Sequence, residues 1–289
     1  MEKILVMGAT GLLGSTLVEF LKNLTNYQVI THSHKKEADF NFDVSKFQET
    51  NKLISKIKPD AIINLIGLTS VEECQNNPNL AYLLNCKTVE NIVTSISNAN
   101  LKTHFLHISS DHLYDGDGPH YEENICIKNN YAFSKYTGEI IAQRIDSSII
   151  RTNFVGKSRS LGRESMTDWL YNSLKNNKKI SVFEDVKFNP LSMKSVSYYI
   201  REIIEKKPLG IFNLGSHNGM SKANFDFIFA ERMNLDTSQM TRMSVDNVDW
   251  DMALRPKDMR MKLDKIEKRL GIKLPTLEDE IKEIAKEYN

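Results

Sequence analysis

The chain has 289 residues, of which 40% are hydrophobic and 26% are charged, and its formal net charge is +1. This composition is typical of a globular protein with a full core, and the charge balance argues against nucleic acid or a membrane surface as a partner. No apolar stretch approaches the length of a membrane span. The three cysteines, Cys74, Cys86 and Cys126, lack metal-type spacing, so we expect a cytoplasmic protein with reduced thiols and no metal.

The first predicted element is a short strand at Lys3–Met7, and three regularly spaced glycines follow it directly. A tight turn needs Gly8, a pyrophosphate can approach the backbone at Gly11, and Gly14 lets the following helix pack close to the strand. The helix, expected at Leu12–Leu24, adds free N–H groups and a dipole that favour phosphate. The pattern predicts dinucleotide binding, and the alternative is a glycine-rich turn in another α/β protein. The expected cofactor contacts here are Gly8, Thr10, Gly11, Leu12, Leu13 and Gly14.

Strand and helix patterns alternate through the rest of the first half. The expected strands are short apolar runs without alternation, as in strands buried on both faces: Gln28–Thr31, Ala61–Ile66, Thr103–Ile108 and Ser147–Arg151. The helices expected between them are Lys46–Ile57, Asn79–Asn98 and Tyr131–Arg144. This order predicts an α/β fold with a Rossmann-type, doubly wound parallel sheet.

After Arg151 the regular alternation of strand and helix patterns ends. Two later strands are expected at Ile180–Phe183 and Gly210–Leu214, and a helical tail at Asp264–Tyr288 is interrupted at Gly271–Pro275. We expect a dinucleotide-binding domain over residues 1–153, with residues 180–214 returning to it. Residues 154–179 and 215–289 are expected to form a smaller C-terminal substrate-binding lobe over the carboxyl ends of the strands.

The end of the second predicted strand bears on the choice of dinucleotide. An acidic residue there would hydrogen-bond the ribose of NAD, but residues 29–36 read VITHSHKK and hold no carboxylate. Donors and positive charge at residues 32–36 suit a 2′-phosphate instead, which favours NADPH over NADH. The alternative is an exposed polar loop that binds nothing. The expected contacts are His32, Ser33 and Lys35, followed by Val44 and by Asp43 at the adenine edge.

Tyr131 and Lys135 form a Tyr-x-x-x-Lys pair on one face of a predicted helix. An isolated tyrosine has a pKa of about 10, and a nearby ammonium lowers the pKa toward the range useful for acid–base work on a carbonyl oxygen. Tyr171 and Lys175 have the same spacing. Only the first pair follows a predicted strand that ends in serines, where Ser110 could hold a substrate oxygen. We therefore expect Ser110, Tyr131 and Lys135 to be catalytic.

Several segments resemble the dTDP-4-dehydrorhamnose reductases, a family within the extended short-chain dehydrogenase/reductases. Residues 107–124 and 129–139 read HISSDHLYDGDGPHYEEN and NNYAFSKYTGE, close to a family pattern of ISTDYVFDG followed by a tyrosine–lysine helix that ends in Gly-Glu. Three more segments agree: KPDAIINLIGLTSVEECQNNPNLAYLLN, RTNFVG and LRPKDMRMKLDKIEKRLGIKLP. The resemblance thus extends over nearly the whole chain.

The resemblance implies a role for each matching residue. Ser110, in place of the family's threonine, would hydrogen-bond the substrate carbonyl. Tyr131 would donate the proton, and Lys135 would tune Tyr131 and hold the nicotinamide ribose. Leu65, Ile66 and Gly67 would line the cofactor beneath the strand ends. The implied substrate-side residues are Thr69, Ser70, Asn85, Asp111, His112, Asn153, Phe154 and Arg255.

Two departures from the family pattern lie on the substrate side. His112 replaces a tyrosine, and Phe154 stands where family members often have tryptophan. They put the identity of the sugar in doubt more than the chemistry. His112 could be a second acid or a hydrogen-bonded loop residue, and both interpretations stay open.

The resemblance implies an NADPH-dependent reductase of a nucleotide-activated 4-keto-6-deoxy sugar, with hydride delivered to C4. It also suggests a homodimer. One alternative is a non-catalytic NADP-binding regulatory subunit resembling the methionine adenosyltransferase β subunit, although Ser110, Tyr131 and Lys135 favour catalysis. Another is a nucleotide-sugar epimerase or dehydratase with bound NAD, which the non-acidic end of the second strand argues against.

Overall fold

The computed structural model describes residues 1–24, 26–248 and 253–289. Within these ranges seven strands form one sheet, and every neighbouring pair in it is parallel. The order across the sheet is β11 (Gly210–Leu214), β6 (Ser147–Thr152), β5 (His104–Ile108), β4 (Ala61–Asn64), β1 (Glu2–Met7), β2 (Tyr27–Ser33) and β3 (Phe40–Asn41). The α/β class and the parallel Rossmann-type sheet are thereby confirmed.

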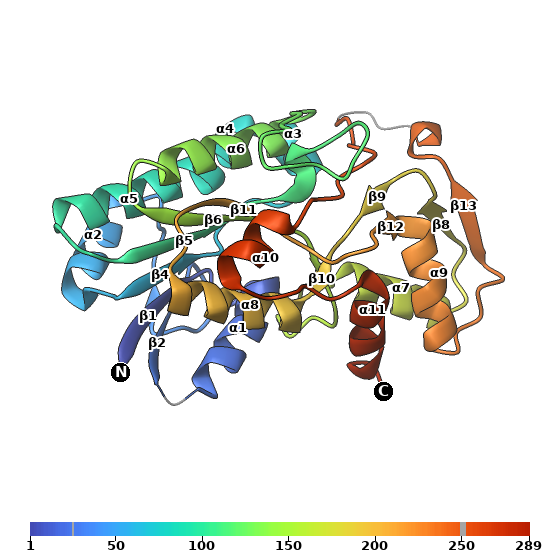
Figure 1. The fold of residues 1–289 in the computed structure, drawn as a ribbon, viewed down its shortest axis with the longest axis horizontal. Coiled ribbons are helices and arrows are strands. Elements are labelled where there is room, and N and C mark those ends of the chain that lie inside the picture. Colours follow the sequence, from blue (N-terminus) through green and yellow to red (C-terminus); the bar gives the residue numbers. More distant parts are fainter. Residues whose placement is uncertain (25, 249–252) are drawn as a thin grey trace.

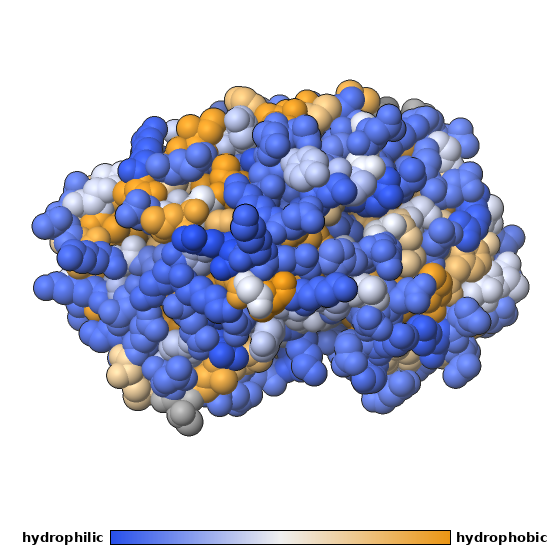
Figure 2. All heavy atoms as spheres, viewed as in Figure 1, coloured by the Kyte–Doolittle hydropathy of each residue, from blue (hydrophilic) through white to orange (hydrophobic). Residues whose placement is uncertain are grey.

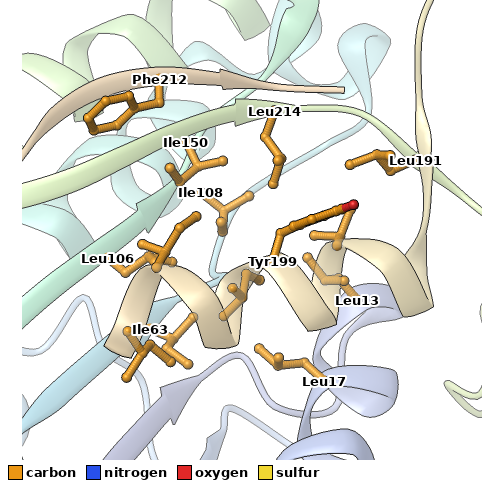
Figure 3. Close-up of a cluster of buried hydrophobic side chains, with 14 of the residues drawn as sticks. Leu13, Leu17, Ile63, Leu106, Ile108, Ile150, Leu191, Tyr199, Phe212 and Leu214 are labelled. Atoms are coloured by element: carbon orange, nitrogen blue, oxygen red, sulfur yellow. The ribbon is translucent and has the colours of Figure 1, made fainter. Parts of the chain in front are cut away.

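Helices cover both faces of this sheet (Figure 1). One face carries α1 (Leu12–Lys22), α8 (Met193–Lys206) and α10 (Asp264–Leu270), and the other carries α2 (Phe47–Ile57), α5 (Thr88–Asn98) and α6 (Asn130–Ala142). Figure 3 shows the core under α1 and α8, where Leu13 and Leu17 meet Tyr199 and the sheet residues Ile63, Leu106 and Ile150. This apolar core between the two helices and the sheet holds the start of α1 next to the carboxyl ends of the strands.

The predicted helix Asn79–Asn98 consists of three pieces, α4 (Pro78–Tyr82), a π-helical turn (Leu83–Lys87) and α5. A short helix, α3 (Val71–Asn76), precedes them. The π turn widens the backbone where α6 crosses closely, since a Cβ at Gly138 would lie only 2.5 Å from the carbonyl oxygen of Asn85. Such turns often occur at functional sites, and this one buries Asn85 close to Gly67, in the segment after β4.

A smaller part of the chain has its own apolar core. It contains α7 (Met166–Lys175), α9 (Lys222–Arg232), α11 (Leu277–Lys286) and the short strands β8 (Ile180–Phe183), β9 (Lys187–Phe188), β12 (Met220–Ser221) and β13 (Met240–Met243). In Figure 1 this part lies on the right, beyond the strand pair β7 (Phe154–Val155) and β10 (Leu191–Ser192). Two one-turn 3-10 helices, at Asp111–Leu113 and Val245–Asn247, complete the elements of the described chain.

The expected return of residues 180–214 to the first domain needs a correction. β11 joins the large sheet beside β6, as expected, but β8 pairs with β13 and packs in the smaller core. The reason is that a four-residue apolar strand fits either sheet, and its partner β13 was not recognised in the sequence. Residues 180–188 therefore belong with the smaller part. Conversely, α10 lies within residues 215–289 that were expected in the smaller lobe, but it packs against α8 and β11 of the larger part.

The surface is mostly hydrophilic on the face drawn in Figure 2, with apolar side chains gathered over the region of α5 and α6. Large exposed apolar residues in the described chain include Tyr82 and Leu83, at the end of α4 and the start of the π turn, and Phe133 and Ile140 on α6. None of the helices in the described ranges is both long enough and apolar enough to span a membrane.

Candidate active site

Two adjoining cavities lie at the carboxyl ends of the parallel strands. The first, of about 270 Å³, reaches from the glycine turn to Ser110, Tyr131 and Lys135. The second, of about 240 Å³, runs from the same turn to the end of β2. A larger open depression of about 810 Å³ between α9 and α11 contains none of the predicted site residues. The chemistry-bearing side chains thus meet in the paired cavities, where open α/β sheets bind their ligands.

The glycine turn has the geometry that the sequence predicts. Gly8 has a φ of +84°, which favours glycine. A Cβ at Gly14 would lie 2.8 Å from the carbonyl carbon of Ala9 and closer still to the carbonyl oxygen of Gly8. Within the described residues no side chain caps α1 at Gly11, so the first N–H groups of the helix are available to an anion.

Ser110 follows β5, and Tyr131 and Lys135 lie one turn apart on α6. The side chain of Asn129 begins α6 by accepting a hydrogen bond from the backbone N–H of Ala132 at 2.9 Å. A hydrogen bond joins the Ser110 and Tyr131 side chains, and Lys135 Nζ donates to the carbonyl oxygen of Ile108 at 2.7 Å. All three expected catalytic residues therefore share one cavity, with the β5 carbonyl holding the lysine.

Burial governs the protonation of Tyr131 and Lys135. The expectation that the Lys135 ammonium lowers the pKa of Tyr131 needs a correction, because burial raises this pKa well above its ordinary value, against the hydrogen bond from Ser110. Burial also lowers the pKa of Lys135 from 10.5 to about 8, with Glu139 one turn further along α6 opposing the shift. Tyr131 is thus held as a phenol with a proton to donate, next to an ammonium whose charge is easily lost.

Asn85 supports the trio from below. Its Oδ1 accepts from the backbone N–H of Leu68 at 2.8 Å, and its Nδ2 donates to the Leu68 carbonyl at 3.1 Å and to Ser134 Oγ at 2.8 Å. Ser134 directly precedes Lys135 on α6. Asn85 therefore ties the segment after β4 to the catalytic helix, without lining the cavity itself.

His112 and Asp111 form the far wall of the first cavity. The His112 ring packs edge-on against Tyr131, with ring centroids 5.3 Å apart, and burial lowers its pKa to about 3. A ring that is neutral at physiological pH fits a packed residue better than a second acid. Asp111 accepts a hydrogen bond from Asn153 Nδ2 at 2.7 Å, and burial raises the pKa of its carboxyl to about 6.

The lining of the second cavity corrects which residues supply positive charge after β2. The ring of His32 is buried, its Nε2 lies 3.0 Å from the carbonyl oxygen of Phe42, and burial lowers its pKa, so it supplies no positive charge. Lys35 is not among the lining residues, whereas Lys36 is. The last three residues of β2 are all buried, with the His32 ring packed against Phe42, and the loop after the strand brings Lys36, not Lys35, to the cavity.

The structure brings most of the expected contacts together. The two cavities are lined by Gly8, Thr10, Gly11, Leu12, Leu13, Gly14, His32, Ser33, Asp43, Val44, Leu65, Ile66 and Gly67, and on the substrate side by Thr69, Asp111, His112, Asn153 and Phe154. Ser70 instead caps α3, accepting from the backbone N–H of Glu73 at 3.1 Å. Arg255 forms an ion pair with Glu72 and lines a neighbouring cavity of about 150 Å³, which His112 also lines.

Two cationic residues at these cavities escaped the sequence reasoning. Arg163 lines both main cavities, and Lys222 lines the small one beside Arg255. Neither belongs to a recognisable motif. Only the three-dimensional path of the loop before α7 and the start of α9 brings them to the site.

The family model described as the RmlD substrate binding domain matches residues 1–289. The chain belongs to this family. The resemblance to the dTDP-4-dehydrorhamnose reductases expected from the sequence is confirmed. The family's fold accounts for the whole length of the chain, including the smaller part with α9 and α11.

Individual relatives are distant but cover almost the full chain. A probable low-salt glycan biosynthesis reductase, Agl14 of Haloferax volcanii, is 26% identical over 96% of this chain and 95% of its own. Methionine adenosyltransferase 2 subunit beta of Pongo abelii is also 26% identical, over 94% of this chain and 83% of its own. A crystal structure of dTDP-4-dehydrorhamnose reductase from Bacillus anthracis in complex with NADP has a TM-score of 0.87, with 21% identity and 99% of each chain covered.

Proposed function

We propose that this protein is an NADPH-dependent reductase of a nucleotide-activated 4-keto-6-deoxy sugar. The observation that carries the proposal is the meeting of Ser110, Tyr131 and Lys135 in one cavity with the phosphate-binding turn at Gly8–Gly14. The reaction class needs these two parts side by side, because a cofactor must lie against the carbonyl that it reduces. Membership of the family and the reductases among its relatives support the same conclusion.

The residues of the cavity supply the acid–base part of the reaction. NADPH, when bound, supplies the hydride that reduces the sugar carbonyl at C4. Ser110 would hydrogen-bond the carbonyl oxygen, Tyr131 would donate its phenolic proton to that oxygen as it becomes a hydroxyl, and Lys135 would stabilise the resulting phenolate. Asn85 would hold α6 at the right distance from the segment after β4.

The second cavity supports NADPH over NADH. Within the described chain the start of α1 has no side-chain cap at Gly11, so its N–H groups can bind the pyrophosphate that NADPH and NADH share. Ser33 and Lys36 line the cavity at the end of β2, where a 2′-phosphate would lie, and β2 ends without a carboxylate. We propose that the seven-stranded part binds the cofactor and the smaller part binds the sugar nucleotide. The homodimer and the cytoplasmic location stay predictions.

The test of this proposal is a substrate panel. The purified protein is incubated with NADPH and, in turn, with dTDP-, CDP-, GDP- and UDP-linked 4-keto-6-deoxy sugars, and oxidation of NADPH is followed by its absorbance. We expect turnover with at least one of them and a 6-deoxy sugar nucleotide as product. Binding of NADPH without turnover on the whole panel would contradict the reductase assignment.

The pH dependence of kcat/KM follows from Lys135. We expect kcat/KM to fall as the pH rises through about 8, because the ammonium loses its charge there. The effect of Lys135 on stability has the opposite sign. Between its folded pKa of about 8 and its ordinary pKa of 10.5, the folded state binds fewer protons than the unfolded state. The contribution of Lys135 to the free energy of unfolding therefore rises with pH in this window. A thermal melt at each pH separates the two effects, and a flat kcat/KM across this window would contradict the assignment.

A regulatory role is the second candidate, since the matched relatives include the methionine adenosyltransferase 2 subunit beta. This chain would then bind NADP and an enzyme partner, without turnover of its own. Affinity capture from its native cell extract distinguishes the two roles. A partner recovered in stoichiometric amount, together with an inactive substrate panel, would favour the regulatory role.

A further inference from the structure

The loop between β7 and α7 crosses from the smaller part of the molecule to the glycine turn. We call residues 157–163 the strap. Its Ser160 Oγ donates to the carbonyl oxygen of Thr10 at 2.7 Å, and Arg159 forms an ion pair with Glu19 of α1. The Nζ of Lys36 donates to Ser160 Oγ at 3.4 Å and also to the carbonyl oxygen of Leu161. The strap is thus fastened to the glycine turn, to α1 and to the loop after β2.

The other end of the strap is fixed to the smaller part. The backbone N–H of Lys157 donates to Glu287 Oε2 at 2.8 Å, and that of Ser158 donates to Asp168 Oδ2 at 3.0 Å. Asp168 also completes a capping box with Ser165 at the start of α7. The strap therefore bridges two structural units, and its last residue is Arg163.

Arg163 lies where the two main cavities meet. The residues that line both cavities are Gly8, Gly11, Leu65, Ile66, Gly67 and Arg163. Among these shared residues, all within the described chain, Arg163 is the one with a charged side chain. A dinucleotide with its nicotinamide half in the first cavity and its adenosine half in the second must pass its pyrophosphate through this junction.

We propose that Arg163 binds the pyrophosphate of the dinucleotide from the side of the smaller part, opposite the free N–H groups at the start of α1. The inference rests on the proposed use of a dinucleotide. A guanidinium presents a planar fork of donors that matches two phosphate oxygens at once, which a lysine cannot do. Arg163 thus makes the strap part of the cofactor site, although its residues lie far along the chain from the glycine turn.

The same geometry divides the phosphates of NADPH between two cations. Lys36 lies in the second cavity alone, at the end of β2, and would bind the 2′-phosphate. Arg163 would bind the pyrophosphate, which NADPH and NADH share. Loss of Lys36 should therefore change the choice between the two cofactors, and loss of Arg163 should weaken both equally.

The test compares Arg163→Gln with Arg159→Gln. Both remove one positive charge from the strap, but Arg159 pairs with Glu19 and is not among the residues that line the cavities. We expect the Kd for NADPH, from fluorescence titration, to rise about tenfold or more in Arg163→Gln and by less than about twofold in Arg159→Gln. Arg163→Lys should give an intermediate value. Equal effects of the two glutamine variants, or no effect of Arg163→Gln, would overturn the proposal.

Adenosine 2′-phosphate, which has no pyrophosphate, separates the two cations. Its affinity should be unchanged in Arg163→Gln and reduced in Lys36→Gln, and Lys36→Gln should weaken NADPH while leaving NADH unchanged. A loss of adenosine 2′-phosphate binding in Arg163→Gln would overturn the assignment of Arg163 to the pyrophosphate. Failure of the unaltered protein to bind NADPH would instead contradict the proposed function. Thermal melts of each variant exclude misfolding as the cause.

Discussion

Replacing Tyr131 with phenylalanine should remove almost all turnover of the 4-keto sugar nucleotide, with kcat lower by about a hundredfold or more. The phenol is buried, hydrogen-bonded to Ser110 and held with its proton in place, and phenylalanine keeps the ring but has no proton to give. The Kd for NADPH should change little, because the ring still fills the wall of the cavity. Stopped-flow oxidation of NADPH and fluorescence titration measure the two quantities.

The chain provides a matched control in its second Tyr-x-x-x-Lys pair. Tyr171 packs against Tyr288, with ring centroids 4.9 Å apart, and the Nζ of Lys175 lies 4.7 Å from the centre of its ring. Both residues belong to the smaller part, and neither lines the main cavities. Tyr171→Phe should keep normal turnover. Full activity in Tyr131→Phe, or an equal loss in both variants, would show that Tyr131 is not the proton donor.

Replacing Arg151 with methionine should lower the free energy of unfolding by about 3–5 kcal/mol. Arg151 donates to both carboxylate oxygens of Glu139, at 2.9 and 2.6 Å, and the two side chains are 1% and 0% exposed. Arg151 also donates to the hydroxyl of Tyr114 at 2.8 Å. Methionine would leave the Glu139 carboxylate buried without its partner. The unpaired buried charge would lower the free energy of unfolding far more than loss of the hydrogen bonds of Arg151 alone. Urea denaturation measures the change.

Two further variants show whether the cost comes from the unpaired charge. Arg151→Met combined with Glu139→Leu removes both charges and should recover a large share of the lost stability. Lys282→Met breaks an exposed pair with Asp279 and should cost at most about 0.5 kcal/mol. If the double variant were less stable than Arg151→Met alone, the explanation by an unpaired buried charge would be wrong.

The sequence was most informative where local chemistry and position in the sheet coincide. The run from Lys3 to Gly14 combines a buried strand, a turn that only glycine allows and the start of a helix, so its role could be inferred without any partner. Tyr131 and Lys135 were separated from Tyr171 and Lys175 by the preceding strand and its serines. In both cases the decisive neighbours are close in sequence, and their geometry is set by one turn or one helix.

Features that depend on distant partners could not be predicted in this way. The two-residue strand β3 is too short to give a pattern, and β8 looks like any buried strand until β13 pairs with it. His32 was expected among the donors and positive charges that follow the second strand, yet its ring packs against Phe42. Arg163 reaches the two main cavities because the strap is held by distant partners, Thr10 among them. Each of these results from tertiary packing that a single sequence does not contain.

The packing of α8 on α1 and the pairing of β11 with β6 mean that the large sheet and its covering helices cannot be completed until late in synthesis of the protein. Residues 1–155 supply six of the seven described strands of the large sheet and the entire glycine turn. Yet α1 buries Leu13 and Leu17 against α8, and β6 gains its second neighbour only with β11. At about 5–20 residues per second, a ribosome needs several more seconds to deliver these pieces. During that interval the nascent sheet has an apolar face and an open edge, so chaperone binding should be strongest when the chain has emerged to roughly β6 and should end once β11 is released.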